Sequence, residues 1–203
     1  GRGAKPHLVS PTEKLRNELL IPTMEAVKTA IGPHYKKLVR MRLDEILKDL
    51  SAEDTGIKGI ALEALSFYLT RLLDLTFVKW RYRSNQTGGT EVDVLVEGAR
   101  LIFSRWQIQC KNTSQANVDD VAKEVGIATA MRTNVIMFVC NGKIGSSIHK
   151  FARTVMENTS IQIILLDHSH LEQIQASPAD ITAILNEQAR QTMEIKRSQI
   201  QDK

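Results

Sequence analysis

The chain has 203 residues, 42% hydrophobic and 25% charged, which is typical of a globular protein and not of a collagenous, disordered or disulfide-framework chain. Its longest apolar runs are strand-sized, far short of the roughly 20 residues of a membrane helix, so we expect no membrane span. The formal net charge is +4, and ten of the 27 Lys and Arg but only six of the 23 Asp and Glu lie before residue 51. This basic segment suits a polyanionic partner, although a solvated helix face explains it about as well.

The two cysteines, Cys110 and Cys140, lie inside apolar, strand-like runs. This position favours two reduced core thiols over a disulfide, and reduced thiols indicate a cytoplasmic protein. The sequence opens without Met and without the charged, apolar and small-residue order of a secretory signal. We therefore expect no signal peptide, and other domains or subunits absent from this chain stay open.

Residues 1–55 are predicted to form a helical extension. Ser10-Pro11 has the pattern of an N-cap followed by a first-turn proline, and apolar residues at helical spacing predict a further helix over 38–50. The extension is expected to position DNA or to form a dimer, with a solvated helix face as the simpler alternative. The basic residues that would contact DNA are Lys36, Lys37, Arg40 and Arg42.

Residues 56–177 are predicted to form an α/β domain, and 178–203 a C-terminal helix that starts at Ser177-Pro178. The expected elements are a helix over 57–75, strands over 76–82, 91–96 and 105–111, a helix over 118–131, a strand over 135–139, a helix over 146–158 and a strand over 161–166. Continuous apolar strands between helices imply a central mixed β-sheet flanked by helices, to which the earlier strands add an antiparallel part.

Polar side chains are predicted to gather on one face of two neighbouring strands. Asp93 projects from the face opposite the valines of its strand. A tight turn at Glu97-Gly98 would leave Asp93 roughly 20 Å from Gln109, at about 3.3 Å per residue, so their meeting requires a wider connection over 98–104 or a bend. In the following strand the residues expected on the polar face are Gln107, Gln109 and Lys111, and those on the other face are Trp106, Ile108 and Cys110.

These residue types match the needs of phosphodiester hydrolysis, which are a hard cation on oxygen ligands, a deprotonated water and positive charge near the developing negative oxygens. Asp93, the Gln109 amide oxygen and the Cys110 backbone carbonyl are candidate ligands for Mg²⁺ or Mn²⁺. Lys111 would orient the water or stabilise the charge, and Glu63 could complete the site from helix 57–75. The simpler alternatives are a surface Asp93–Lys111 ion pair and a solvated Glu63.

The sequence Gly88-Gly89-Thr90-Glu91-Val92-Asp93, followed sixteen positions later by Gln109-Cys110-Lys111, resembles the active-site pattern of the PD-(D/E)xK nucleases. Within them it is similar to the Mrr-type branch, which often carries Gln-x-Lys in place of Glu-x-Lys. The resemblance covers roughly 57–175 and includes the helix acid in Ala61-Leu62-Glu63-Ala64-Leu65, the segment Asn141–Ser146 and the closing strand that ends at Asp167.

The resemblance implies a restriction-endonuclease-like fold and a metal-dependent DNA endonuclease of type II or type IV in a restriction or defence setting. It implies double-stranded DNA as substrate, and a homodimer, since cutting both strands usually needs two active sites. Other activities stay open, namely a junction resolvase, a repair nuclease or a transposase subunit of the same fold. A catalytically silent module that binds DNA or a protein partner is the alternative of a different class. The presence of Asp93 and Lys111 argues against it, and the neutral amide at Gln109 argues mildly for it.

Several further residues have both a functional and a structural interpretation. Gln107 could contact backbone phosphates, as could Lys143 and Ser146 at the start of helix 146–158, where an N-capped connection is equally plausible. His168 and His170 lack further metal-type neighbours at ligand spacing and are expected in a loop at a helix start. The tryptophans, Trp80 and Trp106, are expected in the core.

Overall fold

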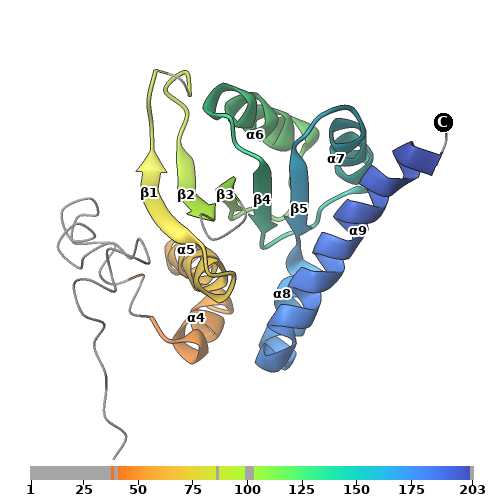
Figure 1. The fold of residues 1–203 in the computed structure, drawn as a ribbon. Coiled ribbons are helices and arrows are strands. Elements are labelled where there is room, and N and C mark those ends of the chain that lie inside the picture. The colour runs from red at the N-terminus through yellow and green to blue at the C-terminus, as the bar shows by residue number, and fades with distance from the viewer. Residues whose placement is uncertain (1–37, 39–40, 86, 99–102, 202–203) are drawn as a thin grey trace, which may run out of the picture.

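A five-stranded mixed sheet forms the centre of the computed structural model, which describes residue 38 and residues 41–85, 87–98 and 103–201 (Figure 1). The strands stand in the order β1-β2-β3-β4-β5; the first three are antiparallel, and β3, β4 and β5 are parallel. Their bounds are β1 Thr76–Tyr82, β2 Val92–Gly98, β3 Ser104–Lys111, β4 Val135–Cys140 and β5 Gln162–Leu166. The predicted mixed α/β sheet is confirmed.

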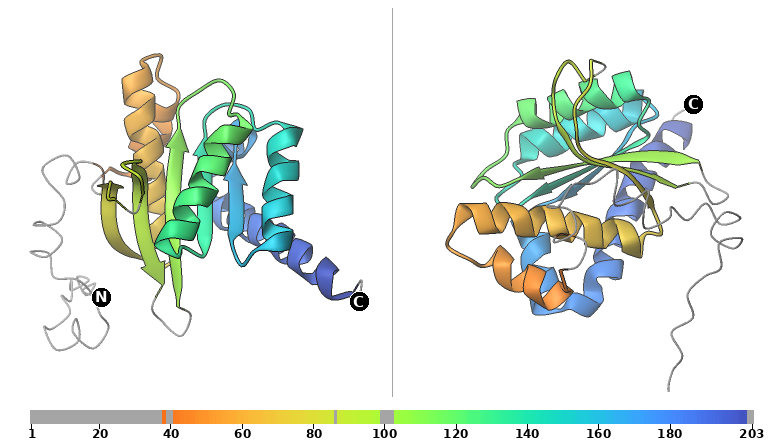
Figure 2. Two further views of the ribbon diagram at one scale, coloured as in Figure 1. Left: turned by 90° about the horizontal axis from the view of Figure 1, so that it is seen from above. Right: turned by 90° about the vertical axis from the view of Figure 1, so that its left-hand side faces the viewer.

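Helices cover both faces of this sheet (Figure 2). The helices α4, α5 and α8 lie on one face, α6 and α7 lie on the other, and α9 packs beside β5 and α7. Their bounds are α4 Leu43–Leu50, α5 Thr55–Leu72, α6 Val118–Met131, α7 Ser146–Asn158, α8 His168–Ala176 and α9 Ile181–Gln201, with a 3-10 turn at Pro178–Asp180. Among the described residues, no helix has the length and apolar character needed to span a bilayer.

Local sequence signals account for where the two helices around the site begin. The Asp54 side chain accepts the Ile57 N–H at 2.9 Å and caps α5. Asn117 and Asp120 form a reciprocal capping box at the start of α6. Both helices then bury an apolar face against the sheet. The α5 face is centred on residues such as Leu62, Leu65 and Ile108, and the α6 and α7 face on Val121, Phe138 and Ile148.

The register between β2 and β3 fixes the position of the polar residues. Gly98 pairs with Ser104 and Val94 pairs with Ile108, so the two strands are joined by a wide connection over 98–104. This register has the wider connection that a meeting of Asp93 and Gln109 requires, and it brings Asp93 beside Gln109.

The first predicted helix, at Ser10, lies outside the described residues, as do Lys36, Lys37 and Arg40. In the predicted helix over 38–50, α4 covers Leu43–Leu50, and its apolar residues pack into the core on the α5 face. The same core contains Ile181 and Leu185 of α9. The division into an extension, a central domain and a C-terminal helix stays a prediction, but the described parts of all three share one core.

Candidate active site

The backbones of β2 and β3 stop pairing beyond Val94 and Ile108, and the Asp93 carboxylate enters the gap. Its Oδ2 accepts the Cys110 N–H at 2.7 Å and an N–H of the Gln109 side-chain amide at 2.8 Å. Asp93 and Gln109 are each only 8% exposed. The structure therefore brings together the acid and the amide that were predicted from the sequence.

The environment of Asp93 penalises its negative charge. Burial raises the pKa of Asp93 to about 6, the Cys110 N–H opposes this rise, and the negative charges of Glu63 and Glu91 add to it. The positive charge of Arg81 lowers the pKa of Asp93. Because nearby positive charge stabilises such a carboxylate, Asp93 has the electrostatics expected of a cation ligand.

Gln109 carries a buried oxygen that has no hydrogen-bond partner. Its Nε2 donates to Asp93 and approaches the Cys110 carbonyl at 3.4 Å, while its Oε1 is buried and unpaired. An unpaired buried acceptor is costly. A cation beside Asp93 would bind this oxygen after a half-turn of the amide, because that turn exchanges Oε1 and Nε2.

Lys111 lies two residues further along the same face of β3, and its ammonium binds α6. Lys111 Nζ donates to Asp120 Oδ1 at 2.6 Å, and Asp120 Oδ2 accepts the Asn117 N–H at 3.1 Å. Partial burial raises the pKa of Asp120, but these hydrogen bonds outweigh it and leave that pKa below its usual value. An ionised Asp120 thus fixes the direction of the lysine, which pairs with Asp120 and not with Asp93 as the simpler alternative proposed.

Gln107 has no surface with which to contact DNA. Its side chain is fully buried, and its Nε2 donates to the Glu124 backbone carbonyl and to Glu124 Oε2, both at 3.0 Å. The predicted phosphate contact of Gln107 therefore conflicts with its burial. The alternation that placed Gln107 on the polar face was right, but α6 covers that face.

Glu124 is a polar residue of this region that sequence reasoning missed. It is 1% exposed, its Oε1 has no partner, and burial raises its pKa to about 7, helped by the charge of Asp93 and opposed by Lys123 and the Gln107 hydrogen bond. The available signal was its position on the apolar face of α6, three residues after Val121 and three before Ile127.

Glu63 approaches the site from α5, and its carboxylate is held by two adjacent residues of β1. Trp80 Nε1 donates to Glu63 Oε2 at 3.0 Å, and Arg81 donates to Glu63 Oε1 at 2.6 Å. The Glu63 side chain is only 13% exposed, so it is not the solvated helix residue of the simpler interpretation. Trp80 and Trp106 are partly buried against the core, as predicted.

The donor set fits a hard divalent cation. Asp93 provides a carboxylate, Gln109 a buried unpaired oxygen, Cys110 a backbone carbonyl and Glu63 a second carboxylate, all of them oxygen ligands of the kind that Mg²⁺ and Mn²⁺ prefer. Within the described residues, no group of three or more His, Cys, Asp and Glu side chains is arranged to hold a metal. Any cation here would therefore depend on the amide and backbone oxygens as well as on the two acids.

The segment after β4 lies against the end of β3. The Asn141 N–H donates to the Lys111 carbonyl at 3.2 Å, and Gly142 sits so close to Thr113 and Ser114 that a Cβ would lie 2.1 Å from the Thr113 carbonyl oxygen. The adjacent residues Lys143 and Ser146 are exposed, and the N-cap residue of α7 provides no side-chain cap. Lys143 and Ser146, the two predicted phosphate contacts, thus follow a segment that is hydrogen-bonded to the end of β3.

Other residues singled out from the sequence lie elsewhere. Arg42 caps α4 and pairs with Asp44 at 3.0 Å, both well exposed. His168 and His170 lie at a helix start as predicted, but within the first turn of α8 and not in a loop, and His170 pairs with the N-cap residue Asp167. Cys110 and Cys140 are free, as predicted, and Cys110 Sγ lies 3.0 Å from Ser66 Oγ.

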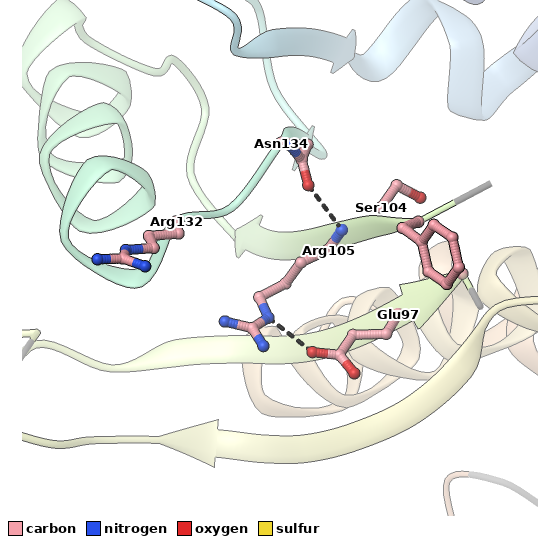
Figure 3. A pocket seen from close by; sticks show the side chains of 7 residues that line it. Glu97, Ser104, Arg105, Arg132 and Asn134 are labelled. Atoms are coloured by element: carbon pink, nitrogen blue, oxygen red, sulfur yellow. Dashed lines mark hydrogen bonds and ion pairs between the residues drawn. The ribbon is translucent and has the colours of Figure 1, made fainter.

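A cavity of about 430 Å³ lies at the opposite end of β3, between the β2–β3 connection and the end of α6 (Figure 3). There Arg105 pairs with Glu97 at 2.6 Å and its N–H donates to the Asn134 side chain at 3.0 Å. Ser104 and Lys111 are the two ends of an eight-residue strand, so the cavity is roughly 20 Å from Lys111 at about 3.3 Å per residue. It is not part of the candidate active site.

Comparison with protein families identifies the domain. The model of the Mrr_cat family, described as restriction endonuclease, matches residues 56–174. The match covers more than half of the chain and contains every residue of the candidate active site. The chain belongs to the Mrr_cat restriction endonuclease family. The resemblance to the PD-(D/E)xK superfamily and its Mrr-type branch is thereby confirmed.

One solved structure similar to this Mrr_cat chain is the DNA modification-dependent restriction endonuclease AspBHI. The two share 12% sequence identity with a TM-score of 0.39, over 96% of this chain and 45% of that enzyme. This chain thus spans less than half of the length of that protein. No curated protein sequence matches the chain.

Proposed function

We propose that this chain is a divalent-metal-dependent DNA endonuclease, in a restriction or defence role, that hydrolyses phosphodiester bonds of double-stranded DNA. The observation that carries the proposal is the β2–β3 register, which sets Asp93 against Gln109 with Lys111 on the same strand face. Mg²⁺ or Mn²⁺, when bound, would supply Lewis-acid activation of the phosphate and of a water molecule. The candidate ligands are Asp93, Glu63, the Gln109 amide oxygen and the Cys110 carbonyl.

In the proposed reaction, a water oxygen bonds to phosphorus, the bond from phosphorus to the departing sugar oxygen breaks, and that oxygen receives a proton. Lys111 provides positive charge where negative charge develops on the phosphate oxygens. Asp120 orients the Lys111 side chain, whose four-carbon stem would otherwise sample many rotamers. Lys143, Ser146 and the basic residues Lys36, Lys37, Arg40 and Arg42 are proposed to contact the DNA backbone.

We further propose that two copies act together, because one active site cuts one strand. The two free thiols support a cytoplasmic location. A catalytically silent DNA-binding module is the second candidate, since the Gln109 amide nitrogen, and not its oxygen, faces Asp93.

Incubation with plasmid DNA separates the two candidates. We expect nicked and linear products with Mg²⁺ or Mn²⁺ and none with EDTA. The assay is run on modified and on unmodified DNA, and cutting of either one supports the nuclease. Undiminished cutting in EDTA would remove the metal-dependent mechanism, and DNA binding without cutting under any of these conditions would favour the silent module.

A further inference from the structure

Arg81 has a backbone conformation that its place in a strand does not explain. Its φ is 45°, in the left-handed region that non-glycine residues rarely adopt. The other two such residues in the described part of the chain, Asp74 and Arg132, follow the ends of α5 and α6, where left-handed residues are common. Arg81 lies inside β1, so its strain points to a functional constraint.

The unusual conformation directs two consecutive side chains to one carboxylate. Neighbouring residues of a regular strand project to opposite faces. Here Trp80 and Arg81 both reach Glu63, on its Oε2 and Oε1 respectively. The Arg81 guanidinium also lies 4.8 Å from the centre of the Trp80 ring, in cation–π contact. Two contacts thus hold the Arg81 guanidinium at the edge of the acidic site, one with Glu63 and one with the Trp80 ring, and Trp80 in turn donates to the same carboxylate.

The charges around Arg81 identify what it does there. Glu63, Glu91 and Asp93 all raise the pKa of Arg81, the Glu63 hydrogen bond most strongly, although partial burial opposes them. Arg81 in turn opposes the rise in the pKa of Asp93. Two of these carboxylates, Glu63 and Asp93, are candidate ligands of a divalent cation, so the guanidinium and the cation would compete for Glu63.

We propose that Arg81 is an internal counter-cation of the acidic site, which exchanges Glu63 for a DNA phosphate when a divalent cation binds. The exchange rests on the proposed function and adds a substrate-binding residue to it. An arginine suits both partners, because its guanidinium donates to carboxylate oxygens, here Glu63 Oε1, and is equally suited to phosphate oxygens. Its side chain is 48% exposed, so it can turn towards a bound duplex without unfolding β1.

The exchange is tested with Ca²⁺, an oxygen-liganded probe, and a short DNA duplex that is checked for cleavage after each titration. Arg81→Gln removes the competing charge, so Ca²⁺ should bind the DNA-free variant about threefold to tenfold more tightly than wild type. In Ca²⁺, the variant should bind DNA with a salt slope shallower by about 0.9, the value for one phosphate contact. In EDTA the two slopes should agree, because Arg81 then stays on Glu63.

Arg83→Gln is the matched control. Arg83 lies two residues after Arg81, directly beyond the end of β1, and pairs with Glu91 at 3.0 Å and not with Glu63. It should leave Ca²⁺ affinity unchanged. Arg81→Lys keeps the charge without the fork, so its Ca²⁺ affinity should stay near that of wild type. Thermal melting of each variant verifies that the fold is retained.

Two results would overturn the exchange: equal Ca²⁺ affinity of wild type and Arg81→Gln, or a slope difference that is the same in EDTA and in Ca²⁺. If wild type still cuts DNA with Mg²⁺, either result removes the exchange alone. If wild type neither binds Ca²⁺ nor cuts DNA, the proposed function and the exchange both fail.

Discussion

Both faces of β3 are covered by a helix, but the two faces bury opposite chemistry. On the α5 face, Ile108 is fully buried in an apolar core, with Trp106 and Cys110 beside it. On the α6 face, Gln107 is fully buried and Gln109 is only 8% exposed, and each retains an unpaired oxygen.

A single strand thus buries apolar side chains on one face and polar side chains with unpaired oxygens on the other. An unpaired buried polar atom costs about 1 to 3 kcal/mol, so a sequence shaped by stability alone would place apolar residues on both faces. Glu124 of α6 adds a third unpaired oxygen to the same layer. The α6 face therefore has buried polar groups of the kind expected at a site that binds a charged group. The α5 face packs into the apolar core and holds β3 in position.

The contrast between the two faces is tested most strongly by substituting neighbouring residues on opposite faces of β3. Lys111→Ala should lower the DNA cleavage rate by at least about a hundredfold while leaving the fold and most DNA binding intact, because it removes positive charge near the reacting phosphate. Cys110→Ala should instead lower the free energy of unfolding by very roughly 1 kcal/mol and spare cleavage by the folded fraction. Single-turnover rates and urea unfolding measure both. Normal cutting by Lys111→Ala would mean that the wrong strand was assigned to catalysis.

The burial of Glu124 predicts a second, smaller effect, on the pH dependence of stability. Burial raises its pKa from 4.5 to about 7, so between these values the folded protein holds a proton that the unfolded chain has lost. This stabilisation is complete below about pH 4.5 and is lost as the pH rises through about 7. Glu124→Gln should therefore exceed wild type in unfolding free energy at pH 8, by on the order of 2 to 3 kcal/mol, and match it at low pH.

Urea unfolding over pH 4 to 8 tests this prediction. Asp119→Asn is the control, because Asp119 is exposed on the same helix and should show little pH-dependent difference from wild type. A Glu124→Gln variant that is less stable than wild type at pH 8 would contradict a charge penalty at this position.

The smallest expected effect concerns the basic extension, which contrasts with the neutral remainder of the chain. Neutralising Lys36, Lys37, Arg40 and Arg42 together should flatten the salt slope of DNA binding by up to about four contacts, at roughly 0.9 per phosphate. An unchanged slope would exclude DNA positioning by these residues. The alternative of a dimer helix has less apolar surface than the sequence suggests, because Leu43 and Leu47 are partly buried against the chain's own core.

The sequence predicted most of the fold because its elements have clear periodicity. The helix over 118–131 and the strand over 76–82 match α6 and β1 in both bounds. The last helix was placed three residues early, because Pro178–Asp180 forms a 3-10 turn before α9 begins. Alternation also assigned the β3 residues to the correct faces, but alternation alone cannot show what covers a face.

The parts of the site that escaped prediction depend on long-range contacts. The burial of Gln107 follows from Glu124, which lies 17 residues away and whose partner no local pattern identifies. The Asp120 contact of Lys111 likewise joins β3 to α6, and no local pattern signals the left-handed backbone of Arg81. Local pattern thus located the acid, the amide and the lysine, and tertiary packing determines which groups hold them.

The most direct test of the account compares two acids on one face of β2. Asp93 and Glu97 lie four residues apart on that strand, Asp93 beside Gln109 and Glu97 beside Arg105 at the far cavity. With Mg²⁺ and plasmid DNA, Asp93→Asn should lower the cleavage rate at least about a hundredfold, as expected for loss of a metal ligand, and Glu97→Gln should stay within about threefold of wild type. Cleavage by Asp93→Asn at the wild-type rate would contradict the assignment of the active site to the α6 face of β3.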